Sequence, residues 1–272
     1  MSKASTSVLP LAGKAGWVTG AGHGIGRSVA LALADLGADV GVNYWHSETG
    51  AKEVVTEIER RGRRGILLPG DVGGEPEVER MVKEVVTAFG RIDFLVNNAG
   101  GLGGARAEDP IETASLEDWN RQIASNLTSA FLCTRHVAPH MLRQRSGRIV
   151  NVSSICAVTG DCGPAYCAAK AGLLGLTRHS AVWLAPHVQV NAVLPGFVSS
   201  QGHDSPKVSR ITPGGRVGHP EEVADLVGYL VASPQTFLTG ACISIDGGLT
   251  NGVISRIMDE SEIRAREKRF AN

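Results

Sequence analysis

The chain has 272 residues, of which 43% are hydrophobic and 20% are charged, and its 27 basic residues balance its 27 acidic ones. This composition is typical of a globular chain that buries a full core, and the zero net charge gives no reason to expect nucleic acid or an anionic membrane as a partner. The amino terminus lacks the apolar core of a signal peptide and no run reaches the ~18 apolar residues of a membrane span, so we expect a cytoplasmic protein.

Short apolar runs alternate with longer amphipathic runs along almost the whole chain, which is typical of βαβ units in a parallel sheet. No repeat, linker or low-complexity segment divides the chain, so we expect a single domain over residues 1–272 with terminal extensions at 1–11 and 251–272. The expected strands cover 15–20, 39–45, 65–72, 91–100, 147–154, 188–196 and 241–248. The expected helices cover 24–37, 48–62, 75–90, 116–144, 164–185 and 221–233.

Cysteine and histidine spacing argues against a disulfide framework and against a metal site. The chain has cysteines at positions 133, 156, 162, 167 and 242. Their number is odd and none forms a C-x-x-C pair, so we interpret them as reduced thiols, and Cys156, Cys162 and Cys167 as small residues that line or back a pocket. The eight histidines show no ligand spacing, and His136 and His179 are interpreted as structural. We therefore expect no metal.

The first strand turns into its helix through "TGAGHGIG", residues 19–26. Glycines at this turn allow the backbone to bend sharply and to approach a pyrophosphate at the helix amino terminus. The spacing is T-G-x-x-x-G-x-G, which differs from the common G-x-G-x-x-G fingerprint. We expect Gly20, Gly24 and Gly26, together with His23 and Ile25 between them, to contact a dinucleotide.

Other motifs follow the carboxyl ends of later strands, where ligands of open α/β sheets bind. "NNAG" (97–100) ends the fourth strand and "NVSS" (151–154) ends the fifth, followed by Tyr166 and Lys170. Together these motifs resemble the short-chain dehydrogenase/reductase family over about residues 12–250. The resemblance implies a Rossmann-like, doubly wound, seven-stranded parallel sheet with helices on both faces. Looser matches are "GDV" (70–72), "SNL" (125–127), "PGFV" (195–198), "GRVGHPEEVA" (215–224) and "SIDGG" (244–248).

Tyr166 and Lys170 are four residues apart and therefore lie on one helix face. A nearby ammonium and an oxidised nicotinamide both favour a phenolate, so we expect the pKa of Tyr166 to fall and the phenol to act as acid and base. By the family resemblance, Lys170 also holds the nicotinamide ribose, which suits its three donors.

A hydroxyl at the end of "NVSS" is well placed to donate to a substrate carbonyl oxygen. We assign this role to Ser154. Ser154 precedes Tyr166 by twelve positions, whereas thirteen is common in the family, so either the loop is one residue shorter here or Ser153 has the role instead. Asn126 matches the family asparagine that helps to position a water for a proton relay to Lys170. Its place inside an expected helix supports a functional reason, because asparagine is disfavoured there.

The remaining cofactor contacts are implied by the resemblance. Asp71 and Val72 are expected at the adenine. The expected contacts near the ribose are Asn98, Ala99 and Gly100. Those near the carboxamide are Pro195, Gly196, Val198 and Ser200.

The end of the second strand sets the choice of cofactor. A site selective for NAD has an acidic residue there, because a carboxylate bonds both ribose hydroxyls and repels a 2′-phosphate. This chain has Asn43, Tyr44 and Trp45, with no acid until Glu48, and "NY" resembles family members that use NADP. We therefore expect NADP(H) to be preferred, with NAD(H) as the alternative. Candidates to contact the phosphate side are Tyr44, Trp45, His23, His46 and Ser47.

The expected activity is that of a carbonyl reductase or alcohol dehydrogenase acting on a small-molecule ketone, sugar or 3-oxoacyl substrate. Two loops, 100–110 and 198–216, set the substrate, and neither carries a general code. A non-catalytic protein that senses a dinucleotide is the alternative, and turnover separates the two. An epimerase or dehalogenase on the same scaffold would usually alter the glycine loop or the Ser/Tyr/Lys set.

The resemblance also implies a homotetramer built on the helices at 116–144 and 164–185 and on the last strand. The tail from 251 onward either covers a neighbouring subunit's site or frays. The apolar residues on these helices exceed what one sheet face needs and include Leu127, Phe131, Leu173, Leu174 and Leu176.

Overall fold

The computed structural model describes residues 9–102, 111–160, 162–199 and 206–251. Seven strands form one sheet in the order β3-β2-β1-β4-β5-β6-β7, and every strand pair in it is parallel. The expected seven-stranded parallel sheet is therefore confirmed. The strands are β1 (Ala15–Val18), β2 (Asp39–Tyr44), β3 (Gly65–Pro69), β4 (Phe94–Asn97), β5 (Gly147–Val152), β6 (Val188–Pro195) and β7 (Cys242–Ile245).

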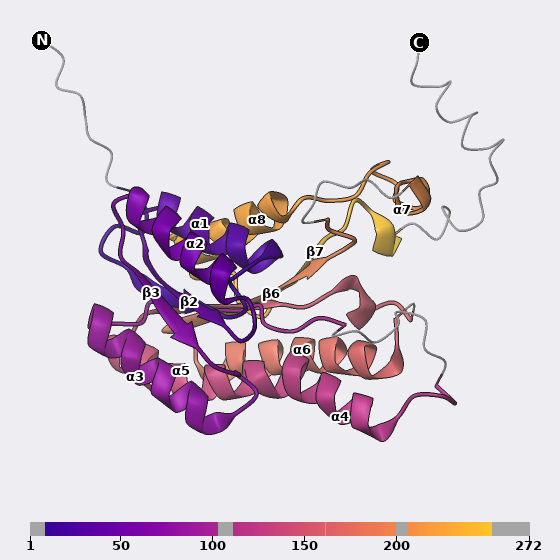
Figure 1. The fold of residues 1–272 in the computed structure, drawn as a ribbon, viewed down its shortest axis with the longest axis horizontal. Helices are drawn as coiled ribbons and strands as arrows, with labels where there is room; N and C mark the ends of the chain where they lie inside the picture. The colour runs from indigo at the N-terminus through magenta and orange to yellow at the C-terminus, as the bar shows by residue number, and fades with distance from the viewer. Residues whose placement is uncertain (1–8, 103–110, 161, 200–205, 252–272) are drawn as a thin grey trace, which may run out of the picture.

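Helices cover both faces of the sheet, with α1, α2 and α8 on one side and α3, α4, α5 and α6 on the other (Figure 1). Successive residues of a strand point to opposite faces, so Trp17 enters the core beneath α3 and α5 while Val18 enters the core beneath α1 and α8. The α-helices are α1 (Gly24–Asp35), α2 (Glu48–Arg60), α3 (Glu75–Phe89), α4 (Leu116–Ile123), α5 (Ser129–Gln144), α6 (Pro164–Trp183), α7 (Pro206–Ile211) and α8 (Pro220–Ala232).

The strand order reverses between β1 and β4, and this switch point positions the site. After β1 the chain adds β2 and β3 on one side, then returns to place β4 on the other side of β1. Loops leaving β1 and β4 in opposite directions open a crevice at the carboxyl ends of the two strands, which is where ligands bind in such sheets. The glycine loop follows β1 and "NNAG" closes β4, so both motifs border this crevice.

The expected boundaries are wrong at several strand ends. β4 and β5 end at Asn97 and Val152, short of the predicted 100 and 154, because the residues that follow form loops of the site. The helix expected over 116–144 has these bounds, but it consists of α4, the π-helix η1 (Ala124–Thr128) and α5 in succession, and the π-helical turn was not predicted. Short helical turns η2 (Ile155–Ala157) and η3 (Leu249–Asn251), and helix α7, lie where loops were expected.

The predicted terminal extensions fall mostly outside the described residues, at 1–8 and 252–272. Within the described part, Leu11 is 5% exposed and its backbone N–H donates to the carbonyl of Leu36, so the chain joins the core before the predicted boundary. None of the described helices is long and apolar enough to cross a membrane. The cytoplasmic location stays a prediction.

Candidate active site

The glycine loop forms a bare backbone cradle at the amino terminus of α1. Gly20 and Gly24 have φ of +62° and +54°, which favours glycine. A Cβ on Gly26 would lie 2.3 Å from the carbonyl oxygen of Gly20 and 2.5 Å from Nδ2 of Asn98, so a larger residue does not fit. The N-cap residue, His23, makes no capping hydrogen bond with its side chain. The first N–H groups of α1 therefore face the crevice without a side-chain cap, as a pyrophosphate site requires.

Thr19 and Asn98 tie the glycine loop to the end of β4. The Thr19 hydroxyl accepts from the backbone N–H groups of Asn98 and Ala99 at 2.9 and 2.8 Å. The Asn98 amide in turn donates to the carbonyls of Thr19 and Gly20 at 2.9 and 3.1 Å. Sequence reasoning missed Thr19, although its fixed place at the start of T-G-x-x-x-G-x-G was a usable signal. Asn98 therefore holds the glycine loop in shape, and the contact of Asn98 and Ala99 with a ribose stays a prediction.

Asn43 joins the glycine loop to the ends of β2 and β3. Its side chain is 2% exposed, accepts from the N–H of Gly20 at 3.0 Å and donates to the carbonyls of Leu68 and Gly70 at 2.9 and 3.1 Å. The amide is used fully within the protein, because it both accepts and donates to backbone groups. The position where an NAD-selective protein would carry its acid thus holds a structural amide.

The surface beyond β2 is formed by an exposed aromatic pair. Tyr44 is 8% exposed and belongs to the core, whereas Trp45 is 61% exposed and its ring stacks on His46 with centroids 4.1 Å apart. A Cβ on Gly22 would lie 2.2 Å from the Ser47 hydroxyl, so the glycine loop touches the start of α2. The predicted contacts Trp45 and His46 therefore lie on the surface beside the loop, while Tyr44 presents little of its ring.

The two candidate serines have different surroundings. The Ser153 hydroxyl is buried and donates to the backbone carbonyl of Lys170 at 2.9 Å. The Ser154 hydroxyl accepts from the N–H of Cys156 at 3.2 Å and forms a hydrogen bond with the Tyr166 side chain. Ser153 thus anchors α6 to β5, and Ser154 is the serine whose hydroxyl is directed to the phenol.

Tyr166 and Lys170 lie together on α6, as the spacing predicts. The Lys170 ammonium is 5.6 Å from the centroid of the Tyr166 ring and donates to the carbonyl of Val152 at 3.0 Å. Lys170 is 3% exposed, and this burial lowers the pKa of its ammonium to about 8. A buried amine that titrates near neutral pH beside a phenol is suited to exchanging protons with it.

The expected fall in the pKa of Tyr166 is not produced by the protein's own groups. Burial raises the pKa of the phenol, and the hydrogen bond with Ser154 lowers it only in part. The Lys170 ammonium donates to the carbonyl of Val152 and lies 5.6 Å from the centroid of the ring, and it does not offset the desolvation of the phenol. The fall expected from an oxidised nicotinamide stays a prediction.

Asn126 lies in the π-helix η1, and its side chain is 1% exposed. Its Oδ1 accepts from the N–H of Gly101 at 2.8 Å, and its Nδ2 lies 2.9 Å from Oε1 of Gln122. A Cβ on Gly100 would lie 2.4 Å from Oδ1 of Asn126, so only glycine fits there. The predicted Asn126 and Gly100 are therefore in contact, and the π-helix is the local device that presents Asn126 to the loop after β4.

The other predicted cofactor positions line the same end of the sheet. Asp71 accepts from the N–H of Gly73 at 2.8 Å, and Val72 is buried. Val198 forms an isolated parallel bridge to Gly218 and lines a cavity of about 130 Å³ between the segment after β6 and the start of α8. The other two, Pro195 and Gly196, end β6 and begin the segment after it, and Ser200 lies outside the described residues.

The expectation that all cysteines are free is wrong for one pair. Cys156 and Cys162 form a disulfide across the segment that joins Ser154 to α6. Of the remaining cysteines, Cys133 is buried and its thiol pKa is raised by that burial, and Cys167 and Cys242 are half-buried. The prediction relied on adjacent-cysteine motifs, whereas here the turn η2 brings together two residues whose Cα atoms are 6.0 Å apart.

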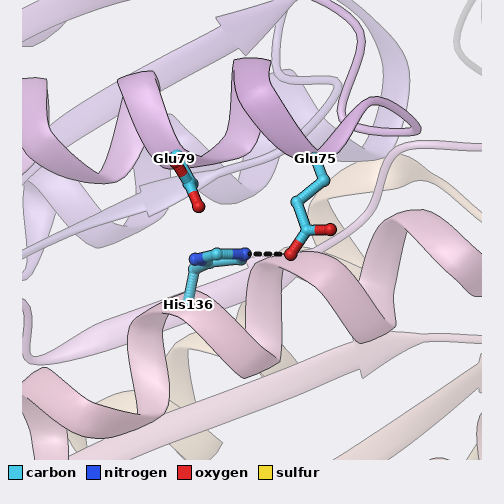
Figure 2. Close-up of side chains that lie close together, drawn as sticks. All are labelled: Glu75, Glu79 and His136. Carbon is cyan, nitrogen blue, oxygen red and sulfur yellow. Dashed lines mark hydrogen bonds and ion pairs between the residues drawn. The ribbon is translucent and has the colours of Figure 1, made fainter.

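A separate polar cluster lies between α3 and α5, away from the glycine loop. Figure 2 shows Glu75 and Glu79 facing His136, with ligand atoms within 4.8 Å of one another. Nε2 of His136 lies 2.9 Å from Oε1 of Glu75, and the Arg135 guanidinium pairs with the same oxygen at 2.9 Å. The hydrogen bond with His136 and the ion pair with Arg135 account for the position of Glu75, and we assign no metal to the cluster.

The residues present fit a nicotinamide dinucleotide. The uncapped start of α1 and the glycine cradle suit its pyrophosphate, and the loops after β4, β5 and β6 border the same crevice. Together with the Tyr166 and Lys170 pair, they define an oxidoreductase of the doubly wound α/β class.

Comparison with known proteins specifies this class. The chain matches the family model described as Enoyl-(Acyl carrier protein) reductase over residues 20–250. It is 42% identical over 238 residues to a 3-oxoacyl-[acyl-carrier-protein] reductase from Synechocystis sp., which covers 85% of this chain and 95% of that protein. It is 40% identical over 244 residues to the 3-oxoacyl-[acyl-carrier-protein] reductase FabG of Staphylococcus aureus, covering 87% and 98%.

Solved structures agree with the fold. An acetoin dehydrogenase from Salmonella typhimurium superposes with a TM-score of 0.80 at 31% identity, covering 88% of this chain and 96% of that one. A short-chain type dehydrogenase/reductase from Mycobacterium marinum gives 0.82 at 33% identity, covering 89% and 97%. The chain belongs to the short-chain dehydrogenase/reductase family. It is an oxidoreductase that acts on CH–OH groups with a nicotinamide cofactor.

Proposed function

We propose that the protein is an NADP(H)-dependent carbonyl reductase or alcohol dehydrogenase in which Tyr166 is the acid and base. The observation that carries the proposal is the contact between Tyr166, the Ser154 hydroxyl and the buried Lys170 at the crevice edge. A donor, a proton source and a cation at one place are what carbonyl reduction requires.

The proposed roles follow from the contacts. Bound nicotinamide supplies or accepts the hydride. Ser154 donates to the carbonyl oxygen of the substrate, and Tyr166 transfers a proton to that oxygen. Lys170, with a pKa of about 8, exchanges protons with the phenol near neutral pH and holds the nicotinamide ribose. Asn126 orders the loop after β4 on the other side of the site and helps to position the relay water.

For the substrate we favour a 3-oxoacyl group or another medium-sized ketone. Two relatives of about 40% identity that span nearly the whole chain are named 3-oxoacyl-[acyl-carrier-protein] reductases. The solved acetoin dehydrogenases, at 31% and 34% identity, favour a small ketone as the second candidate. A sugar is the third, and a panel of these carbonyl compounds assayed by nicotinamide absorbance separates them.

The test of the mechanism is Tyr166→Phe, which removes the hydroxyl and keeps the ring. We expect kcat to fall by at least about a hundredfold, the lower range for general acid catalysis, with cofactor affinity retained. Thr159→Val, which removes a hydroxyl bonded to the carbonyl of Ile155 at 3.2 Å, is the matched control and should keep turnover. Near-wild-type turnover by Tyr166→Phe would overturn the assignment.

For the cofactor we propose a preference for NADP(H) over NAD(H). Asn43 is committed to the backbone, and no carboxylate lies between residues 43 and 47 to repel a 2′-phosphate. The nearest acid, Glu48, is paired with Lys52 at 2.7 Å. The exposed Trp45 and His46, with the half-buried Ser47 beside them, offer a surface for the phosphate.

Kinetics with both cofactors test this preference. We expect a higher kcat/KM with NADPH than with NADH, and Trp45→Asp should shift the ratio toward NADH by placing a carboxylate beside the ribose. Trp45→Asn is the control, because asparagine has the size of aspartate and lacks its charge. A higher kcat/KM for NADH in the wild type contradicts the preference.

We also propose a homotetramer built on α4, α5 and α6. Phe131 on α5 is 44% exposed, and Val182 and Trp183 at the end of α6 are 74% and 73% exposed. Leu173 and Leu174, which the sequence assigned to the interface, are instead buried in the chain. The exposed apolar side chains that these helices offer for association are Leu116, Trp119, Phe131, Leu142, Val182 and Trp183.

A further inference from the structure

Gln122 is a buried amide at the end of α4, one helical turn before Asn126. Its side chain is 1% exposed, although a buried glutamine is costly unless both ends are bonded. Both ends are bonded here. Its Oε1 lies 2.9 Å from Nδ2 of Asn126, and its Nε2 donates to the carbonyl of Leu102. The side chain therefore connects Asn126 to the loop that leaves β4.

Oε1 of Gln122 is one of several acceptors that surround the Asn126 amide. Nδ2 of Asn126 has four acceptors within reach, which are the carbonyls of Gly101 and Gln122 at 3.1 Å, the Ser125 hydroxyl at 3.1 Å and Oε1 of Gln122 at 2.9 Å. An amide has only two N–H groups to share among them. The side-chain oxygen of Gln122 is the nearest of the four and lies on the preceding helical turn.

Gln122 also lies near the acid and base candidate. It lines a small pocket together with Leu102, Trp119, Pro164 and Tyr166, between the start of α6 and the loop after β4. One side chain thus lines a pocket with Tyr166, bonds Asn126 and bonds the loop at Leu102. A methyl or methylene group in its place would fill the volume and hold neither polar neighbour.

We propose that Gln122 is a positioning residue for the reaction, which holds the Asn126 amide and the loop after β4 in the arrangement that proton transfer at Tyr166 and Lys170 needs. The inference rests on the proposed function. Gln122 acts through Asn126 and does not touch the reacting atoms. Its loss should therefore lower kcat and move its pH profile while leaving cofactor affinity unchanged.

The experiment compares Gln122→Met with Gln144→Met. Gln144 is a matched control, because it holds the chain just before β4, whereas Gln122 holds the loop after β4. Its side chain accepts from the N–H of Ile92 at 3.0 Å and donates to the carbonyl of Ile92 at 2.7 Å. We expect Gln122→Met to lower kcat about tenfold, the equivalent of one lost buried hydrogen bond, and to displace the basic limb of the kcat profile. Gln144→Met should lower Tm and leave kcat and its profile as in the wild type.

A double-mutant cycle shows whether Gln122 acts through Asn126. In an Asn126→Ala background, Gln122→Met should cost no further kcat. Equal and additive losses in both backgrounds, or a Gln144→Met profile identical to that of Gln122→Met, would overturn the inference. If Gln122→Met does not fold, Gln122→Glu keeps the acceptor for Asn126 and loses the donor to Leu102. In the same cycle, the kcat losses of Gln122→Glu and Asn126→Ala should still be non-additive. Additive losses count against the inference.

Failure of the proposed function gives a different result. Turnover by Tyr166→Phe and by Asn126→Ala at the wild-type rate removes the proposed mechanism itself. Collapse of those two variants, with Gln122→Met unchanged in kcat and pH profile, removes only the role of Gln122.

Discussion

Replacing Asn43 by aspartate should destabilise the protein rather than create an NAD site. The new carboxylate can still accept from the N–H of Gly20, but it faces the carbonyls of Leu68 and Gly70 where the amide donated at 2.9 and 3.1 Å. Each buried acceptor left without a donor costs about 1–3 kcal/mol, so we expect a loss of about 3–5 kcal/mol at neutral pH once charge burial is added. This is a large part of the 5–15 kcal/mol that holds a typical domain together.

The stability of Asn43→Asp relative to the wild type should fall as the pH rises. Burial against two carbonyls raises the pKa of the introduced carboxyl in the folded state above its unfolded value of about 3.9. The variant is therefore closest to wild type below that pH, where the protonated carboxyl donates to one carbonyl, and it loses stability as pH rises through the folded pKa. Urea unfolding at pH 4 to 8 measures the difference, with exposed Asn120→Asp as the control that should change stability by under about 0.5 kcal/mol. Equal stability of Asn43→Asp and wild type at pH 8 would refute the reasoning.

Three further expectations concern Lys170, the cysteines and assembly. Because burial lowers the pKa of Lys170 to about 8, the folded state loses its proton first, and the free energy of unfolding should rise between pH 8 and about 10 by up to about 3 kcal/mol. Lys170→Met should lack this rise. An identical rise in the wild type and in Lys170→Met would contradict the assignment to Lys170. Unfolded, unreduced protein should present three thiols to Ellman's reagent and five after reduction, and five without reductant would exclude the disulfide. Light scattering should give about four times 28.5 kDa, falling on Trp183→Glu, whereas a mass of 28.5 kDa for the wild type refutes the tetramer.

The sheet could be predicted from the sequence because its central strands are largely buried on both faces. A strand such as β1, AGWV, is buried at every residue and appears as a continuous apolar run, and amphipathic helices between such runs leave a parallel sheet as the simple arrangement. The pairing of Tyr166 with Lys170 was predictable for the same reason, since it depends only on helical spacing.

Features set by tertiary hydrogen bonds were not predictable. Asn126 was noticed as unusual in a helix, but the sequence pattern did not show that the helix becomes a π-helix there. Asn43 was interpreted from the acidic group that this position lacks. Its three hydrogen bonds, to Gly20 in the glycine loop, Leu68 in β3 and Gly70 after β3, depend on segments distant in sequence. The Cys156 and Cys162 pair likewise depends on the turn η2, which carries no cysteine motif.

The side chains that shape the crevice share one physical property, which is that they bond backbone groups at the ends of neighbouring strands. Thr19, Asn43 and Asn98 each bond backbone groups of neighbouring strand ends, so the ends of β1, β2, β3 and β4 are connected to one another as well as to the glycine loop. Backbone groups at strand ends have no ladder partner, and burying them unpaired would cost free energy. The short polar side chains satisfy them while leaving the N–H groups at the start of α1 for a ligand. Stability of the sheet and order of the cofactor site therefore depend on the same hydrogen bonds, so variants of these residues should lose both together.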